Sequence, residues 1–161
     1  MELAQNLINY DFVNEGLLQQ VLRVAGAPGA RDEGNKPLGK VGDTVINTVI
    51  SVACYHEGLT IGATTNRIQT LANNDRLAQL CDLSGLTGCI RNNSARWNMV
   101  SARTKATTLE AVVGAVFLDA GIQGIAAAKR VMLALDVIQV TLLKPSTPIH
   151  LLETEHRTGV G

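Results

Sequence analysis

Apolar residues in the first half of the chain recur at intervals of three and four positions, which places them on one face of a helix. A strand would need strict alternation of apolar and polar residues, and the adjacent apolar pairs at 45/46 and 49/50 break it. Pro37 suits a first helical turn, where its missing N–H has no partner. The pattern predicts a helix from about Pro37 to Tyr55, with apolar positions 41, 45, 46, 49, 50, 52 and 53 on its buried stripe.

The rest of the hydrophobic pattern also predicts helices. A loop rich in Gly and charged residues, 26–36, precedes the central helix, and Gly and Asn residues separate the later segments. Aromatic residues make up only 3% of the chain, so Leu, Val, Ile and Ala must build the core. We therefore expect an all-α bundle, with a short turn or helix at 2–9 and helices near 14–22, 37–55, 61–71, 76–81, 107–119 and 125–137.

The predicted helix at 107–119 has two notable features. Its small residues Ala111, Gly114 and Ala115 recur at helical spacing, which lets the backbone of a neighbouring helix come close. Glu110 lies in its expected first turn, where the helix dipole favours an anion. A purely structural role is therefore one interpretation of this carboxylate.

Composition limits the function classes. The chain has 161 residues, which suits one domain, and 14 Lys and Arg balance 14 Asp and Glu, so any RNA contact must come from a local patch. No apolar run is long enough to span a membrane, and the start of the chain resembles neither a secretory nor a transit signal. Three cysteines without CxxC spacing favour reduced thiols in an intracellular protein, whether cytoplasmic, nuclear or mitochondrial.

Four segments in order resemble the ribonuclease III domain. The family's hallmark helix reads Asn-Glu-Arg-Leu-Glu-Phe-Leu-Gly-Asp-Ala-Val-Leu, and a later segment reads Glu-Ala-x-x-Gly-Ala-x-Tyr-Leu-Asp-x-Gly. The resemblance covers about residues 3–137 and implies a ribonuclease III-like domain at 1–140, with a tail at 141–161 that is too short for a double-stranded-RNA-binding domain. The matching residues are Asn35, Leu38, Gly42, Asp43 and Val45 in the hallmark, the stretch 110–121 in the later segment, and shorter matches at 10–22 and 58–78.

The resemblance also implies a metal site, because active members cut double-stranded RNA with Mg²⁺ held by four carboxylates. A hard cation takes oxygen ligands, activates water and stabilises the displacement at phosphorus. Carried onto this chain, the acid positions are Gly39, Asp43, Thr107 and Glu110, so two of the acids are lost. Asp43 and Glu110 remain as the candidate catalytic and metal-binding residues, and Mg²⁺ or Mn²⁺ is needed only if nuclease activity survives.

Further departures concern RNA and assembly. The most basic neighbourhood, with no acid from 91 to 105, either contacts RNA phosphates or forms a solvated face. Family domains form homodimers in which the hallmark aromatic residue packs into the partner, and that position is Lys40 here. Lys36 and Pro37 replace the other hallmark Glu and its Arg. The candidate RNA-binding residues are Arg91, Arg96, Arg103 and Lys105.

We interpret the chain as a degenerate ribonuclease III-fold protein that is catalytically inactive or strongly impaired. It would act as a dimeric RNA-associated or scaffold module, with a ribosomal or RNA-processing assembly as the partner class. The alternative is a divergent double-stranded-RNA endonuclease, which uses a reduced metal site or an intact ribonuclease III-fold partner chain. A third is a protein-interaction module without RNA contact. The leading interpretation requires residues 39, 43, 107 and 110 to line one pocket.

Overall fold

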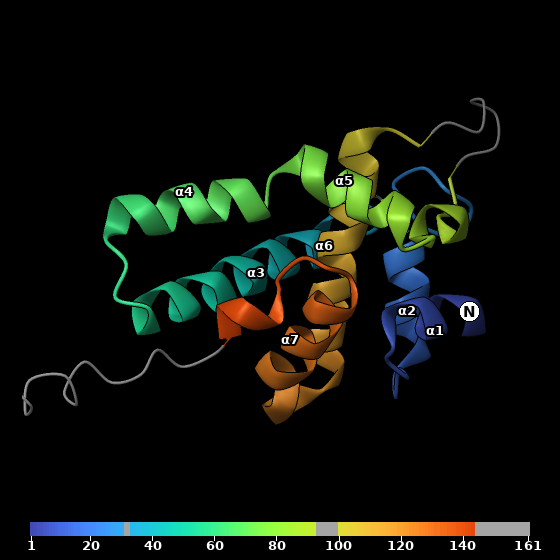
Figure 1. Ribbon diagram of the computed structural model, residues 1–161. Helices are drawn as coiled ribbons and strands as arrows, with labels where there is room; N and C mark the ends of the chain where they lie inside the picture. Colours follow the sequence, from blue (N-terminus) through green and yellow to red (C-terminus); the bar gives the residue numbers. More distant parts are fainter. Residues whose placement is uncertain (31–32, 93–99, 144–161) are drawn as a thin grey trace, which may run out of the picture.

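The computed structural model describes residues 1–30, 33–92 and 100–143, and every regular element within these ranges is helical (Figure 1). The all-α prediction is therefore confirmed. A single isolated bridge joins Arg23 to Arg91 in this part of the chain. The α-helices are α1 (Glu2–Ile8), α2 (Glu15–Leu22), α3 (Lys36–His56), α4 (Ile61–Leu71), α5 (Asn74–Leu83), α6 (Ala102–Asp119) and α7 (Gly124–Ala134); 3₁₀ turns are η1 (Leu86–Cys89), η2 (Gly121–Gln123) and η3 (Val140–Leu143).

Helices α3 and α6 form the centre of the bundle, and α5, α7 and α2 pack around α6. The predicted apolar stripe of α3 is largely buried: Ile46, Val49 and Ile50 are at most 1% exposed. Val52 is the exception, at 43% exposed. By contrast, α4 runs beside α3 toward one end of the molecule and has no buried residue (Figure 1). The core that positions the α3–α6 pair thus lies away from α4.

The start of α6 differs from the sequence prediction. The helix begins at Ala102 rather than near 107, and the Ser101 hydroxyl caps it by accepting a hydrogen bond from the Thr104 backbone N–H. Residues 102–105 lack an apolar stripe, so periodicity alone did not reveal this turn. As a result Glu110 lies in the middle of α6, and the proposed stabilisation by the first-turn dipole is wrong.

A buried amide fixes the start of α3 against its neighbours. Asn35 is 2% exposed, and its Nδ2 donates to the carbonyl of Val21 at the end of α2 and to the hydroxyl of Thr108 in α6, both at 2.9 Å. The Thr108 hydroxyl in turn donates to the Thr104 carbonyl at 2.9 Å. Because buried polar groups are costly unless paired, this chain of hydrogen bonds holds α2, α3 and α6 in register.

The other end of α6 is tied to the N-terminal segment. The Asp119 carboxylate accepts hydrogen bonds from the Tyr10 hydroxyl at 2.9 Å and from the backbone N–H groups of Val13 and Asn14 at 2.9 and 2.8 Å. The connection between α1 and α2 is thereby attached to α6.

Among the helices of the described residues, none combines the length and apolar character needed to cross a membrane.

Candidate nuclease-type site at the crossing of two helices

Two glycines let α3 and α6 cross with their backbones in contact. A Cβ atom built on Gly42 would lie 1.7 Å from the Glu110 carbonyl oxygen, and one built on Gly114 would lie 2.3 Å from the Leu38 carbonyl oxygen. Neither position can accept a side chain without moving a helix, because both obstacles are backbone atoms. The crossing therefore fixes which residues of α3 face which residues of α6 on either side of it.

The pocket beside this crossing contains all four positions at which the family motif places an acid. It has a volume of about 380 Å³. Residues three or four apart share a helical face, so 39 and 43 lie together on α3 and 107 and 110 lie together on α6. The packing of α3 against α6 then brings the two pairs to one pocket. The lining residues are Lys36, Gly39, Lys40, Asp43, Arg103, Thr107 and Glu110.

Asp43 is already bonded within its own helix. Its Oδ2 lies 3.2 Å from the Lys40 ammonium, and its Oδ1 accepts a hydrogen bond from Asn47 Nδ2 at 2.9 Å. The Asn47 amide oxygen is buried and has no hydrogen-bond partner within the described residues. Both oxygens of the remaining hallmark acid thus have positively polarised neighbours.

Glu110 lies in a less polar environment. Burial raises the pKa of its carboxyl to about 7, the negative charge of Asp43 adds to the rise, and the Lys40 ammonium opposes it. The carboxyl is therefore protonated in a substantial fraction of molecules near neutral pH. Such a group is a weaker metal ligand than an ordinary glutamate, because a cation competes with the proton.

The space for a side chain at position 39, where the family resemblance places an acid, is limited. A Cβ atom on Gly39 would lie 2.9 Å from Thr107 Cγ2, 3.2 Å from the Thr107 carbonyl oxygen and 3.7 Å from Glu110 Oε2. The methyl of Thr107 therefore fills part of the volume that a side chain at position 39 would need. Gly39 and Thr107 therefore face each other across the pocket, and a side chain at position 39 would contact Thr107.

The donor set does not fit the divalent cation that the fold family implies. Mg²⁺ takes six oxygen ligands in a strict octahedron and gives up its water reluctantly. Here the Asp43 carboxylate is bonded to the Lys40 ammonium and the Asn47 amide. The Glu110 carboxyl, with its raised pKa, is partly protonated near neutral pH. Within 1–30, 33–92 and 100–143, no three His, Cys, Asp or Glu residues group closely enough to hold a metal ion.

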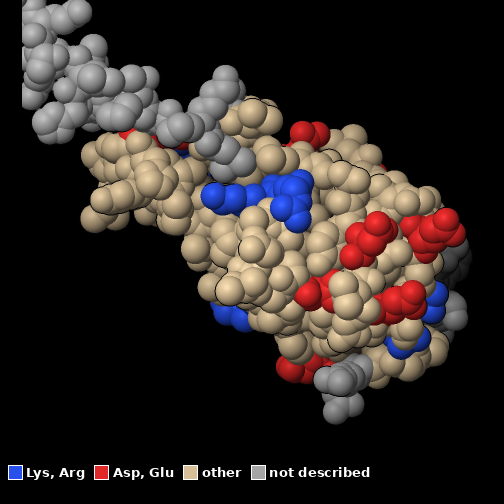
Figure 2. Space-filling view, turned by 90° about the horizontal axis from the view of Figure 1, so that it is seen from below, with Lys and Arg blue, Asp and Glu red and all other residues tan. Residues whose placement is uncertain are grey.

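The predicted RNA-binding residues do not form one cluster. Arg103 lines the pocket, whereas Lys105 forms an ion pair with Asp82 at 2.8 Å. Arg91 is exposed, and its backbone pairs with Leu22 and Val24 at the end of α2. Arg96 lies outside the described residues. The molecular face in Figure 2 carries basic and acidic side chains together, in keeping with the zero net charge.

Two pocket cations, Lys36 and Lys40, were not predicted as functional residues from the sequence, where they count only as replacements for hallmark residues. The available signal was helical spacing, because positions 36, 39, 40 and 43 lie three or four apart on one face of α3.

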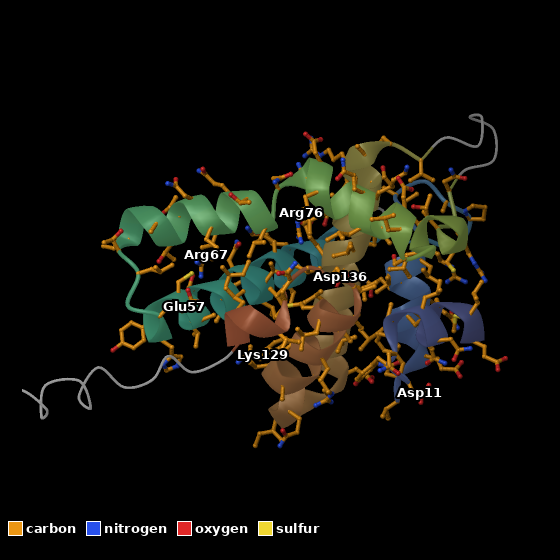
Figure 3. The ribbon with its side chains drawn as sticks, viewed as in Figure 1. Asp11, Glu57, Arg67, Arg76, Lys129 and Asp136 are labelled. Carbon is orange, nitrogen blue, oxygen red and sulfur yellow. The ribbon has the colours of Figure 1, made fainter. Side chains whose placement is uncertain are left out.

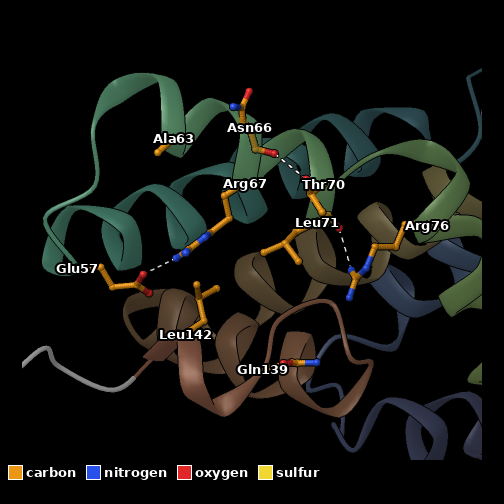
Figure 4. Close-up of a pocket in the computed structure, with 9 residues that line it drawn as sticks. All are labelled: Glu57, Ala63, Asn66, Arg67, Thr70, Leu71, Arg76, Gln139 and Leu142. Carbon is orange, nitrogen blue, oxygen red and sulfur yellow. Dashed lines mark hydrogen bonds and ion pairs between the residues drawn. The ribbon is translucent and has the colours of Figure 1, made fainter.

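A larger pocket, of about 870 Å³, lies between α4 and the body of the domain (Figures 3 and 4). Its charged side chains are already bonded: Arg67 pairs with Glu57, and Arg76 donates to the carbonyl oxygens of Leu71, Asp136 and Val137. These bonds join α3 to α4 and fix the turn after α7. The pocket lacks paired acids, so we place the candidate site at the α3–α6 crossing.

The described part of the chain is all-helical, and its candidate site is a pocket where α3 and α6 cross. The family model for the ribonuclease III domain matches residues 37–121. The chain belongs to the ribonuclease III domain family.

Solved structures give the same fold. Two structures of the nuclease domain of ribonuclease III from Campylobacter jejuni are similar, each with 24% sequence identity. One has a TM-score of 0.74 and the match covers 83% of this chain and 94% of that one; the other has 0.73, with 84% and 92% covered. The Campylobacter domain in the first of these structures shows structural flexibility in a region involved in dimer formation.

Proposed function

We propose that this protein is a ribonuclease III-fold module that binds RNA, or scaffolds an RNA-containing assembly, without cleaving it. The observation that carries the proposal is the state of the four acid positions. Two have no carboxylate, Asp43 is bonded to Lys40 and Asn47, and Glu110 has a raised pKa. A ribosomal or RNA-processing particle is the partner class that suits such a module.

The chemistry supports an inactive site. Hydrolysis of a phosphodiester by this kind of centre needs a metal ion to activate water and to stabilise charge on the leaving oxygen. Lys40 supplies a positive charge beside Asp43, but an ammonium has no open coordination position for water. The pocket can therefore stabilise an anion without generating a nucleophile.

The direct test is incubation of the purified protein with duplex RNA in Mg²⁺ and, separately, in Mn²⁺. An active ribonuclease III serves as the positive control. We expect no cleavage above the background of the Asp43→Ala and Glu110→Ala variants. Turnover that either substitution abolishes would contradict the proposal, and failure to bind duplex RNA even at low salt would favour the protein-interaction alternative.

A divergent endonuclease is the second candidate function, and one observation favours it. Asp43 and Glu110 still face the same pocket, and a carboxyl with a pKa of about 7 suits general acid–base catalysis near neutral pH. Such an enzyme would complete its metal site with substrate oxygens or with an intact partner chain. The double variant Gly39→Glu/Thr107→Asp discriminates between the two functions. Cleavage gained there means that the wild type is inactive and that only the acids were missing, and no gain means that the RNA-binding surface has diverged too.

We also propose that the chain forms a homodimer. The support is its similarity to a nuclease domain that has a region involved in dimer formation. The Lys40 side chain is 80% exposed in the single chain and pairs with Asp43, so it would enter an interface with a counter-charge. Sedimentation velocity should give a dimer that Lys40→Phe strengthens, and a monomer at about 100 µM would contradict the proposal.

A further inference from the structure

The pocket at the α3–α6 crossing contains more positive than negative groups. Lys36, Lys40 and Arg103 line it together with only two carboxylates. Lys40 is paired with Asp43, while no ion pair among the described residues involves Lys36 or Arg103. Both of these side chains belong to exposed residues, so their charged ends can reach a ligand at the pocket mouth.

Where the pocket residues differ from the family motif, every difference makes the pocket more positively charged. Lys36 stands where the motif has Glu, and Lys40 stands where it has an aromatic residue. Gly39 stands where the hallmark has an acid, and Thr107 stands where the resemblance places an acid of the later pair. The opposite change, from Arg to Pro37, falls on a residue that does not line the pocket. A site that had only lost its metal would need no added cations.

The backbone adds to this positive field. Lys36 and Gly39 lie in the first turn of α3, and Arg103 lies in the first turn of α6. The N-terminal ends of helices carry partial positive charge. The positive ends of both helices therefore lie at the side of the pocket where Lys36 and Arg103 are found.

We infer that this pocket binds a phosphate group directly, through Lys36 and Arg103, without a divalent metal ion. Lys40 has a separate task, since its ammonium neutralises Asp43, which would otherwise repel the ligand. The inference rests on the proposed function for the source of the phosphate, which is the backbone of RNA. It deepens that proposal by giving the former metal site a metal-free role.

The test compares two variants that each remove two positive charges. Lys36→Gln/Arg103→Gln changes the pocket, and Lys129→Gln/Arg130→Gln changes α7 outside it. Fluorescence anisotropy with a labelled RNA duplex, in EDTA and between about 50 and 200 mM salt, gives affinity and salt dependence. We expect the pocket variant to lose about tenfold or more in affinity, and the slope of log K against log salt to shrink by about one per lost contact.

Several outcomes would overturn the inference. Equal losses in the two double variants would mean that only overall charge matters. Unchanged RNA binding in the pocket variant would mean that RNA binds elsewhere on the surface. Binding that disappears in EDTA would show that a metal ion is needed after all. Lys40→Gln should also weaken binding several-fold, and an increase in affinity would contradict its neutralising role.

A second experiment tests phosphate binding in the pocket independently of RNA. Inorganic phosphate is titrated into isotope-labelled protein, and the backbone amide signals of residues 36, 39 and 103 are followed by NMR. Saturable shifts in the wild type that vanish in the pocket variant support a phosphate site, even if duplex RNA does not bind and the proposed function fails. Absence of saturable shifts together with absence of RNA binding overturns the site itself.

Discussion

Helices α3 and α6 meet at the glycine crossing and, one turn away on α3, at the pocket. Different atoms limit the size of a side chain at these two places. At the crossing, Gly42 and Gly114 face backbone atoms of the other helix. In the pocket, Gly39 faces the side chain of Thr107 as well as its carbonyl oxygen. The crossing matches the family motif, whereas the pocket has Gly39 and Thr107 at two positions where the family resemblance places acids. One helix pair can therefore keep the fold while its chemistry changes.

Helix packing and the chemistry of the pocket depend on different residues of α3 and α6. A side chain at Gly42 would require the helices to separate, so the whole core depends on that position. A side chain lost at position 39 leaves only local space, which the methyl of Thr107 partly fills. A change of side chain at position 39 therefore disturbs the fold only locally, whereas a side chain at position 42 would disturb the packing of both helices.

The largest expected effect is at the crossing. Gly42→Ala should destabilise the fold by about 3 kcal/mol or more, because the new methyl would meet the Glu110 carbonyl 1.7 Å away. Chemical denaturation measures the change. Gly62→Ala in α4 is the matched control, since nothing lies within 4 Å of its Cβ position. That change should be neutral or stabilising by up to about 1 kcal/mol, and equal effects of the two substitutions would contradict the comparison.

A smaller effect is expected in the pocket. Gly39→Ala should cost about 1–2 kcal/mol, because its methyl would lie 2.9 Å from Thr107 Cγ2. Thr107→Ser removes that methyl and keeps the hydroxyl, so Gly39→Ala should cost less in the Thr107→Ser background. A double-mutant cycle measures the coupling, expected at about 0.5–1 kcal/mol. Strict additivity would mean that the Thr107 carbonyl oxygen, not its methyl, limits the site.

The smallest effect is the pH dependence that Glu110 imposes. Its folded pKa of about 7 lies above the 4.5 of the free side chain, so between these values the folded state holds a proton that the unfolded state has lost. This carboxyl therefore lowers stability as pH rises through that window, by about 1 kcal/mol after allowance for its partial exposure.

Glu110→Gln should remove that slope. Denaturation midpoints measured from pH 4.5 to 8 should fall more steeply for the wild type than for the variant, and Glu33→Gln, at an exposed carboxylate, is the control. Parallel curves for wild type and Glu110→Gln would show that the carboxyl is better solvated than its position suggests.

The sequence predicted the central helices well where burial imposes a period. The helix predicted at about 37–55 is α3 at Lys36–His56, and the one predicted at 61–71 is α4 at Ile61–Leu71. The start of α6 was missed because its first turn is polar, and only the cap at Ser101 marks it. Spacing placed 39 with 43 and 107 with 110 on one helical face each, and the family resemblance brought the two pairs together; all four positions do line one pocket.

The electrostatics of that pocket were beyond the reach of sequence reasoning. The bonds of Asp43 to Lys40 and Asn47 depend on side-chain conformations that no motif specifies. Likewise, the apparent basic patch at 91–105 includes Lys105, whose partner Asp82 comes from another helix. Pairing between distant elements requires the assembled fold.

The Asp119 carboxylate has a practical consequence for protein engineering. Two of its three hydrogen bonds are to main-chain N–H groups. The carboxylate can therefore hold the segment before α2 in place with other side chains at positions 13 and 14. Val13 is 91% exposed. Position 13 is therefore an anchored attachment point, where a spectroscopic label would report on the whole domain rather than on a loose arm.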